Sequence, residues 1–134
     1  MAADEFSLIA QYFSACGAQG DDTLLGVGDD CALLQAPAGE VLAVTTDTLL
    51  AGVHFPNDSP ARKIAQRALA AHPSDMAAMG ATPRWCQMAL TLPDAEQDWL
   101  SEASAGISCM DCEFNRPMVG GGDTQTPRTP PVNP

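Results

Sequence analysis

The sequence predicts a layered domain of the α/β or α+β class, and three observations support that fold class. Amphipathic helical patterns alternate along the chain with short apolar runs that have the length of strands. The chain has 134 residues, which suits one domain or a piece of a larger protein. Hydrophobic residues make up 46% of the sequence, which is enough to form a core.

The N-terminal part is predicted to hold a helix at residues 5–15 followed by short extended segments. Four apolar residues of this helix share one face because they follow the spacing i, i+3, i+4 and i+7: Phe6, Ile9, Ala10 and Phe13. A short strand is expected at residues 24–27, a turn at 28–30 and extended chain at 31–35.

Residues 41–46 read Val-Leu-Ala-Val-Thr-Thr and predict a buried strand that ends at Asp47. After a loop, Ser59 is expected to cap a helix that runs to Ala71, with Pro60 in its first turn. Pro73 is expected to break that helix, because proline cannot donate a backbone hydrogen bond and disfavours helical geometry at the residue before it.

A second short helix is predicted from Asp75 to Met79, closed by Gly80. Residues 85–92 predict a strand that ends at Pro93, and Asp94 with Gln97 resembles a capping box that opens a helix reaching about Cys112.

The C-terminal part is predicted to contain a short strand at Met118 and Val119, which runs into a glycine-rich loop at residues 120–123. From Thr124 onward, four prolines occur in eleven residues. We therefore expect an N-terminal domain over residues 1–123 and an extended, disordered tail over residues 124–134.

The net charge is −11, with 17 acidic and 6 basic residues. This charge argues against nucleic acid and anionic membranes as partners, because both require a basic surface. It suits a protein that binds anionic substrates through metal ions, although acidity can also serve only solubility. No apolar run is long enough to span a membrane, and the acidic N-terminus does not resemble a signal peptide, so a cytoplasmic location is expected.

The five cysteines are expected to be reduced and mostly buried thiols. Cys109 and Cys112 form the one Cys-x-x-Cys motif, which has no second pair and no nearby histidine. The motif is therefore weak evidence for a zinc or redox site.

Four acidic positions lie beside glycine, serine or threonine, where the chain is expected to turn at the end of an element. They are Asp29 with Asp30, Asp47, Asp75 and Asp123. Carboxylates at element ends can converge, and converging carboxylates select a hard cation such as Mg²⁺ or Ca²⁺. The alternative for the first pair is a simple Gly-Asp turn, and for Asp47 and Asp75 it is a capping role.

Two further features fit a phosphate-handling metal site. The loop of residues 120–123 exposes backbone amides that can cradle a phosphate, although it can also be a flexible turn, and it is not a Walker motif. His54 lies in an apolar loop, where it is either a structural histidine or a contact to phosphate or a heterocycle. No serine nucleophile with a histidine base is indicated, so any catalysis is expected to be electrostatic.

Five segments in the same order resemble the thiamine-monophosphate kinase family over residues 1 to about 124. These segments are residues 5–9, 26–32, 46–55, 74–81 and 121–124. The resemblance implies an α+β fold, with a mixed sheet flanked by helices, which is the N-terminal ATP-binding domain of the aminoimidazole ribonucleotide synthetase-like fold. It also implies a homodimer formed through the N-terminal sheets.

The family transfers the γ-phosphate of ATP to thiamine monophosphate and yields thiamine diphosphate. By resemblance, His54 is a substrate contact, Gly122 and Asp123 contact ATP, and Asp29 is a supporting residue. The implied Mg²⁺ ligands are Asp30, Thr45, Thr46, Asp47, Asp75 and Asp123.

Three departures from the family pattern accompany the resemblance. The family has Asn-x-Ser-Asp where this chain has His72-Pro73-Ser74-Asp75, and a glycine is inserted before Asp123. The family also continues with a C-terminal domain, so we expect this chain to be an N-terminal half without turnover of its own. The alternative is a non-catalytic metal- and nucleotide-binding or dimerisation module of the same fold.

Overall fold

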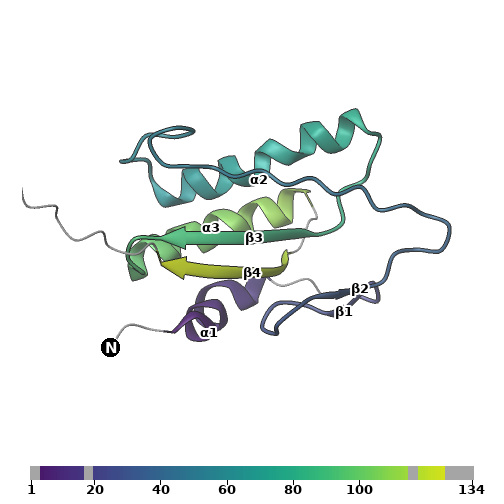
Figure 1. Cartoon of the computed structure of the whole chain (residues 1–134), viewed down its shortest axis with the longest axis horizontal. Helices are drawn as coiled ribbons and strands as arrows, with labels where there is room; N and C mark the ends of the chain where they lie inside the picture. Colours follow the sequence, from purple (N-terminus) through teal and green to yellow (C-terminus); the bar gives the residue numbers. More distant parts are fainter. Residues whose placement is uncertain (1–3, 17–19, 115–117, 126–134) are drawn as a thin grey trace, which may run out of the picture.

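The computed structural model describes residues 4–16, 20–114 and 118–125, and for residues 110–125 it describes only the backbone. Its helical elements and strands are shown in Figure 1. In chain order they are α1 (Glu5–Leu8), η1 (Ile9–Phe13), η2 (Ser14–Cys16), β1 (Thr23–Leu25), β2 (Leu33–Leu34), α2 (Ala61–Ala78), β3 (Cys86–Leu92), α3 (Gln97–Phe114) and β4 (Met118–Gln125). The α+β class is confirmed, with an antiparallel pair β1–β2 and a parallel pair β3–β4.

The elements β3, α3 and β4 form one β–α–β unit. Parallel neighbours need a crossover connection, and α3 supplies it. Gly120, Gly121 and Gly122 pair with residues 87–89 of β3, so the predicted glycine-rich loop is in fact strand. Glycine is weak in a strand but pairs when a neighbouring strand supplies the hydrogen bonds. The strand continues to Gln125, and residues 126–134 of the expected tail lie outside the described residues.

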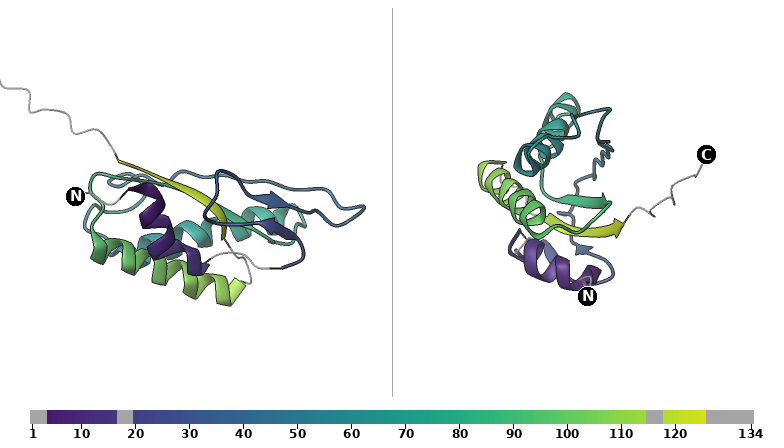
Figure 2. Two further views of the ribbon diagram at one scale, coloured as in Figure 1. Left: turned by 90° about the horizontal axis from the view of Figure 1, so that it is seen from below. Right: turned by 90° about the vertical axis from the view of Figure 1, so that its left-hand side faces the viewer.

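The core lies between one face of β3 and the helices. Along β3, Cys86, Met88, Leu90 and Leu92 are buried or half-buried, whereas the residues between them are exposed. This period of two follows from the pleat of a strand. Figure 2 shows the helices gathered on one side of the β3–β4 pair. Leu100 of α3 is fully buried at the centre, with Ala103 and Ile107 beside it.

The N-terminal segment is helical as predicted for residues 5–15, but the predicted apolar face is wrong in part, because Phe6 is 64% exposed and Ala10 is exposed while Phe13 is buried. Asp4 caps α1, because its Oδ1 accepts a 2.7 Å hydrogen bond from the backbone N–H of Ser7. Leu8, Phe13 and Cys16 are buried against the core, and Cys16 Sγ lies 3.0 Å from Ser108 Oγ of α3. The continuation of α1 is π-helical and then 3₁₀-helical, which the spacing of apolar residues does not distinguish from an α-helix.

The helix α2 runs unbroken through Pro73, so the predicted break and the separate helix from Asp75 to Met79 are wrong. Proline removes one hydrogen-bond donor, but its fixed φ is already helical, and alanines flank this turn on both sides. The helix ends as predicted at Gly80, where φ is +66°, and the N–H of Ala81 bonds the carbonyl of Met76 at 2.9 Å.

The starts of the two long helices differ slightly from the prediction. The N-cap of α2 is Pro60 and not Ser59, and it provides no side-chain cap. The helix α3 begins at Gln97, where the N–H of Leu100 already bonds the carbonyl of Glu96 at 3.0 Å. It therefore starts later than a capping box at Asp94 would place it.

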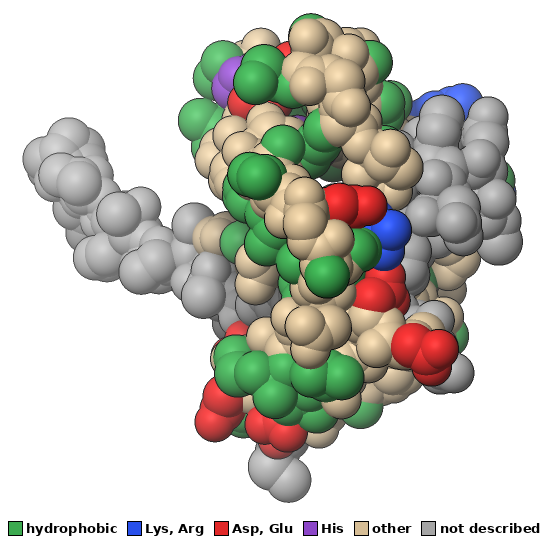
Figure 3. Space-filling view, turned by 90° about the vertical axis from the view of Figure 1, so that its right-hand side faces the viewer, with side chains coloured by type: hydrophobic (Ala, Val, Ile, Leu, Met, Phe, Trp, Pro, Cys, Tyr) green, Lys and Arg blue, Asp and Glu red, His purple; other side chains and the backbone are tan. Residues whose placement is uncertain are grey.

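Residues 41–46 form no strand, which contradicts the predicted buried strand. Val41 is 94% exposed and Val44 is 85% exposed. The segment has β propensity, but a strand needs a neighbouring edge to pair with, and no described strand lies beside it. Apolar side chains are visible across the face of the molecule in Figure 3.

The hairpin β1–β2 is anchored to the start of β3. Arg84 Nη1 donates to Asp22 Oδ2 at 3.1 Å, and Trp85 Nε1 donates to Thr23 Oγ1 at 3.2 Å. Both contacts join the start of the hairpin, at residues 22 and 23, to the residues that lead into β3.

The cysteines with described side chains form no disulfide. Cys16 is buried and Cys86 half-buried, but Cys31 and Cys109 are exposed, so the expectation of mostly buried thiols is wrong. Within the described part of the chain, no helix is long and apolar enough to cross a membrane.

Candidate metal centre

Asp47, His72 and Asp75 converge in space although two different segments supply them. Asp47 belongs to the extended segment 41–50, and the other two residues belong to α2. One ligand atom from each of the three side chains lies within 4.8 Å of the other two. His72 Nδ1 is 3.9 Å from Asp47 Oδ2. The convergence of Asp47 and Asp75 agrees with the prediction made from their sequence positions.

The unbroken helix α2 supplies two of the three residues of this cluster. His72 and Asp75 are three residues apart, and residues at that spacing lie on the same face of an α-helix. A helix broken at Pro73 would give these two side chains no fixed relation. The continuation of α2 past this proline is therefore what aims both groups toward Asp47.

The cluster has the electrostatic character of a cation site. Asp47 and Asp75 are exposed, and two carboxylates at such short range repel one another unless a cation lies between them. His72 Nδ1 is buried from solvent and has no hydrogen-bond partner in the described part of the molecule. Its side chain is 25% exposed overall, so the open part of the ring lies elsewhere than at this nitrogen.

The donor set fits a divalent metal ion. Carboxylate oxygens suit Mg²⁺, Ca²⁺ and Mn²⁺, whereas imidazole nitrogen suits Zn²⁺ and other transition metals. Thr45 and Thr46 directly precede Asp47, the first half-buried and the second exposed, and so can offer hydroxyl oxygens from the same segment. The two carboxylates thus fit the Mg²⁺ that the sequence suggests, and the imidazole adds a donor of another kind.

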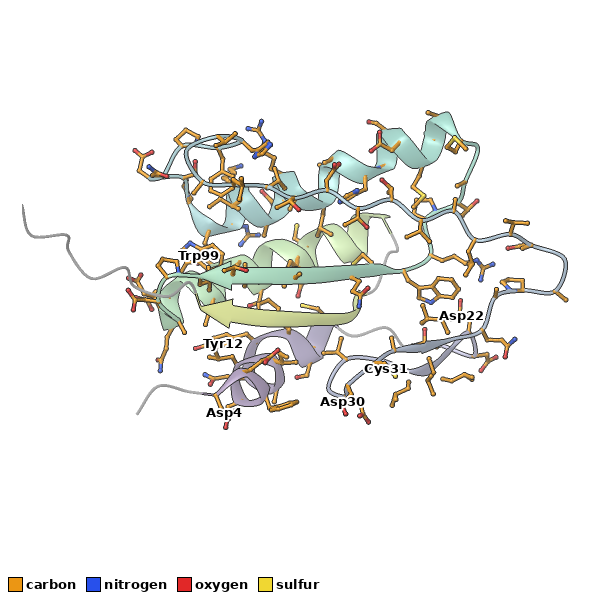
Figure 4. All side chains as sticks on the ribbon, viewed as in Figure 1. Asp4, Tyr12, Asp22, Asp30, Cys31 and Trp99 are labelled. Carbon is orange, nitrogen blue, oxygen red and sulfur yellow. The ribbon has the colours of Figure 1, made fainter. Side chains whose placement is uncertain are left out.

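Asp30 lies in the turn between β1 and β2 and is not part of this cluster. The backbone N–H of Asp30 donates to Asp29 Oδ1 at 2.9 Å, and Gly28 has φ +113°. Both observations match the Gly-Asp turn that was the alternative for this pair. Figure 4 shows Asp30 below the β3–β4 pair, on the side away from α2.

Gly122 and Asp123 lie in β4, where their backbones pair with Ala89 and Leu90 of β3. The side chain of Asp123 lies outside what the structure describes. Its role as a metal ligand and the nucleotide contact of both residues therefore stay predictions.

His54 lies in a tight turn between Leu50 and Phe55. Its Nδ1 accepts a 2.9 Å hydrogen bond from the backbone N–H of Leu50, and its own N–H donates to the Leu50 carbonyl at 2.9 Å. The residue therefore has the structural role that was one of its two interpretations. Because Nδ1 is an acceptor, a neutral His54 carries its proton on Nε2, and the exposed ring presents a donor to an incoming group.

His72 is the site residue that the sequence interpretation missed. The predicted break at Pro73 leaves His72 just after the end of a helix, where its side chain has no fixed relation to Asp75. The signal was the i, i+3 spacing of His72 and Asp75, which becomes informative only if the helix continues through Pro73.

Comparison with known proteins agrees with this fold. Residues 28–134 match the family model described as AIR synthase related protein, N-terminal domain. The match covers most of the chain, so the chain belongs to this family. The fold of this chain is similar to a crystal structure of thiamine-monophosphate kinase from Stenotrophomonas maltophilia K279a, with a TM-score of 0.75 and 47% sequence identity. The similarity covers 81% of this chain and 34% of that one.

Curated relatives carry the same name. The thiamine-monophosphate kinase of Escherichia coli K12 is 46% identical over 127 residues, which are 95% of this chain and 39% of that protein. The Haemophilus influenzae protein is 41% identical over 126 residues, with 93% and 38% covered. This chain thus spans about two fifths of the length of the relatives that it matches.

Proposed function

We propose that this chain supplies the metal- and nucleotide-binding part of a kinase that transfers the γ-phosphate of ATP to thiamine monophosphate. The observation that carries this proposal is the convergence of Asp47 and Asp75 from separate segments. Membership of the family and the names of the relatives support it. The product is thiamine diphosphate, and the proposed setting is the cytoplasm.

The residues of the chain have separate roles in this proposal. Asp47 and Asp75 hold Mg²⁺, with Thr45 and Thr46 as further oxygen donors. Asp123 is an additional carboxylate, and Asp30, which lies outside this cluster, is assigned to a further Mg²⁺ ion. When bound, Mg²⁺ neutralises phosphate charge and orients the in-line transfer. Gly122 has no Cβ, which permits close approach of a nucleotide to the backbone.

His54 is the proposed contact to the phosphate of thiamine monophosphate. The hydrogen bond from Leu50 N–H to its Nδ1 leaves Nε2–H as the available donor of this exposed residue. A donor in a fixed tautomer suits a phosphate oxygen, which is an acceptor. The chain shows no activated nucleophile among these residues, so orientation and charge neutralisation carry the reaction.

We also propose that the chain pairs with a second copy through the segment 41–46. The exposure of Val41 and Val44 supports this, since a strand-forming apolar run with no described strand beside it is a place where another chain can pair. Sedimentation velocity over a range of protein concentrations tests the idea. A monomer at every concentration would contradict it.

A second candidate function is a binding module that takes metal and nucleotide without turnover. The exposed carboxylates of Asp47 and Asp75 favour it, because they offer metal ligands whether or not a product forms. The two candidates agree on the cluster and differ only in whether product forms.

A coupled assay with ATP, Mg²⁺ and thiamine monophosphate separates the two candidates. Formation of thiamine diphosphate supports the kinase and excludes the pure binding module. For either candidate, Asp47→Asn is expected to weaken Mg²⁺-dependent nucleotide binding about 10–100-fold, the range found when groups around metal sites are removed. Asp98→Asn, which removes an exposed carboxylate from the first turn of α3, is the charge-matched control and should bind normally. Equal nucleotide binding by wild type and Asp47→Asn would contradict the proposed site.

A further inference from the structure

The tight turn around His54 holds the imidazole ring through a hydrogen bond in which the ring is the acceptor. The backbone N–H of Leu50 donates to His54 Nδ1 at 2.9 Å. Other bonds close the turn without the ring: the backbone N–H of His54 reaches the Leu50 carbonyl at 2.9 Å, and the N–H of Gly52 reaches the Phe55 carbonyl at 2.7 Å. The N–H of Leu50 therefore acts on the side chain of His54, while carbonyl groups hold the backbone.

The bond from Leu50 is compatible with only one charge state of His54. A neutral imidazole has one acceptor nitrogen, whereas an imidazolium has two donors and no acceptor. Protonation of His54 would therefore set the N–H of Leu50 and an N–H of the ring against each other. Because Leu50 is 54% exposed, water can replace the lost partner. Protonation is thus expected to free the ring without unfolding the turn.

Neighbouring charges do not hold the ring of His54 in place through ion pairs. The charged residues along this stretch of chain and at the start of α2 are Asp47, Asp58, Arg62 and Lys63. In the part of the chain that the structure describes, His54 forms no ion pair with any of them. The hydrogen bond from Leu50 is therefore the contact that positions the ring.

We propose that Leu50 is a positioning residue, whose backbone N–H holds His54 neutral with Nε2–H as the donor to a phosphate oxygen, so that acidification weakens this contact. The inference rests on the proposed function for the identity of the phosphate ligand. A protonated ring adds charge, but a charged pair at an exposed site gains little. The ring that protonation has freed must also be ordered again by the ligand, which costs affinity. We therefore expect the contact to weaken in acid, although imidazolium is the better partner for phosphate in isolation.

Two amides of the turn give a matched measurement that needs no ligand. The N–H of Leu50 bonds the ring, and the N–H of His54 bonds a carbonyl, both at 2.9 Å. Only the ring is an acceptor that takes up a proton between about pH 8 and pH 5. Amide exchange should therefore show that Leu50 loses protection relative to His54 as the pH falls through this range. A scalar coupling across the bond, between the Leu50 nitrogen and His54 Nδ1, should disappear over the same range.

The variants His54→Asn and His54→Gln separate the two nitrogens of the ring. Asparagine can place an acceptor near the position of Nδ1 and does not titrate, so Leu50 should stay protected at every pH. It lacks the Nε2–H contact. The longer glutamine can place an N–H near the position of Nε2 but leaves the N–H of Leu50 without this acceptor. Protection of Leu50 should therefore be low at every pH in His54→Gln.

Thiamine monophosphate with Mg²⁺ is the probe for the contact itself. Its phosphate also takes up a proton near pH 6, so wild type and His54→Asn are compared at the same pH. Near pH 7.5 the wild type should bind about 2–10-fold more tightly, which is the contribution of one neutral hydrogen bond. Near pH 5.5 the two proteins should bind about equally, because the ring is then protonated and no longer held.

Two results would overturn the inference. One is a Leu50 amide in the wild type whose protection does not fall relative to that of His54, which would show that the ring is not held in its neutral state. The other is an advantage of the wild type over His54→Asn that grows in acid, which would show that His54 binds as a cation. Both leave the proposed function standing if thiamine monophosphate binds. Absence of binding at either pH, together with the expected loss of Leu50 protection, would contradict the proposed function and support the positioning by Leu50.

Discussion

Two regions of the molecule are rich in apolar residues but differ in burial: the layer formed by α2, α3 and β3, and the segment 41–50. In the layer, Leu100 is fully buried and Ile107 is 3% exposed. In the segment, Val41 and Val44 are 94% and 85% exposed. The difference shows that an apolar sequence becomes core only where another element offers a surface to pack against.

The candidate metal centre lies where these two regions meet. The layer contributes His72 and Asp75 on one face of a helix, and the segment contributes Asp47. The helix fixes His72 and Asp75 relative to each other. The third residue, Asp47, lies in a segment without regular secondary structure. The positions of His72 and Asp75 therefore depend on the packed helix, and the position of Asp47 depends on the segment 41–50.

Truncation of Leu100 to alanine should have the largest effect on stability. The side chain is fully buried, and leucine-to-alanine changes in cores cost about 3–5 kcal/mol. Val44→Ala is the counterpart in the segment and should change the free energy of unfolding by less than about 0.5 kcal/mol, because that side chain is exposed. Urea denaturation measures both.

The same pair of variants sharpens the comparison when it is measured at two protein concentrations. Leu100→Ala should lower the free energy of unfolding by the same amount at both protein concentrations. A destabilisation by Val44→Ala that grows with protein concentration would mean that a second copy buries the segment. Equal and large losses in both variants at low concentration would contradict the contrast between the two regions.

Gly106→Ala tests how closely the two long helices approach. A Cβ at this position would lie 2.8 Å from the carbonyl oxygen of Arg62 in α2, which no real structure tolerates without a shift. Because the clash is with backbone, α2 and α3 must move apart, and overpacking of this kind costs about 1–3 kcal/mol.

Glu102→Ala is the control for Gly106→Ala on the same helix. Glu102 is exposed, so its loss should change the unfolding free energy by less than about 0.5 kcal/mol. Thermal or urea unfolding of both variants gives the comparison. A Gly106→Ala protein as stable as Glu102→Ala would show that the helices are less closely packed than described.

The sequence predicts the layer well because its signals are local. The spacing of Phe6, Ile9, Ala10 and Phe13 predicts the N-terminal helical segment, and the apolar run of residues 85–92 predicts β3. Gly80 predicts the end of α2, because glycine readily adopts the positive φ that follows a helix C-terminus, and its φ is +66°. Such signals need only the residue and its near neighbours.

The failures have a common cause, which is dependence on distant parts of the chain. Residues 41–46 have strand propensity but no described strand to pair with, whereas the glycines of β4 lack propensity and pair with β3. Pro73 lies inside α2 without ending it, because the rest of the helix, on both sides of the proline, keeps its helical geometry. For the site, the convergence of Asp47 and Asp75 was predictable, but His72 was not, because its position depends on that unbroken helix.

The smallest expected effect concerns the start of α1, where stability comes from a cap and not from packing. The N–H of Ser7 donates to the Asp4 carboxylate, and this backbone hydrogen bond, with a contribution from the Ser7 side chain, lowers the pKa of Asp4 below its ordinary value. A lowered pKa in the folded state means that the cap contributes stability above the ordinary aspartate pKa of about 4. That contribution is lost as the pH falls through the lowered pKa.

Asp4→Asn separates the charge of this cap from its hydrogen bond. Asparagine caps helices about as well as aspartate but does not titrate, so the variant should keep the first turn of α1 without any change below pH 4. Amide exchange of Ser7 followed from pH 6 to pH 3 is the measurement: protection should fall in the wild type and stay level in Asp4→Asn. If protection fell equally in both, the loss would come from the packing of α1 on the layer, and the start of α1 would behave like the core and not like a local cap.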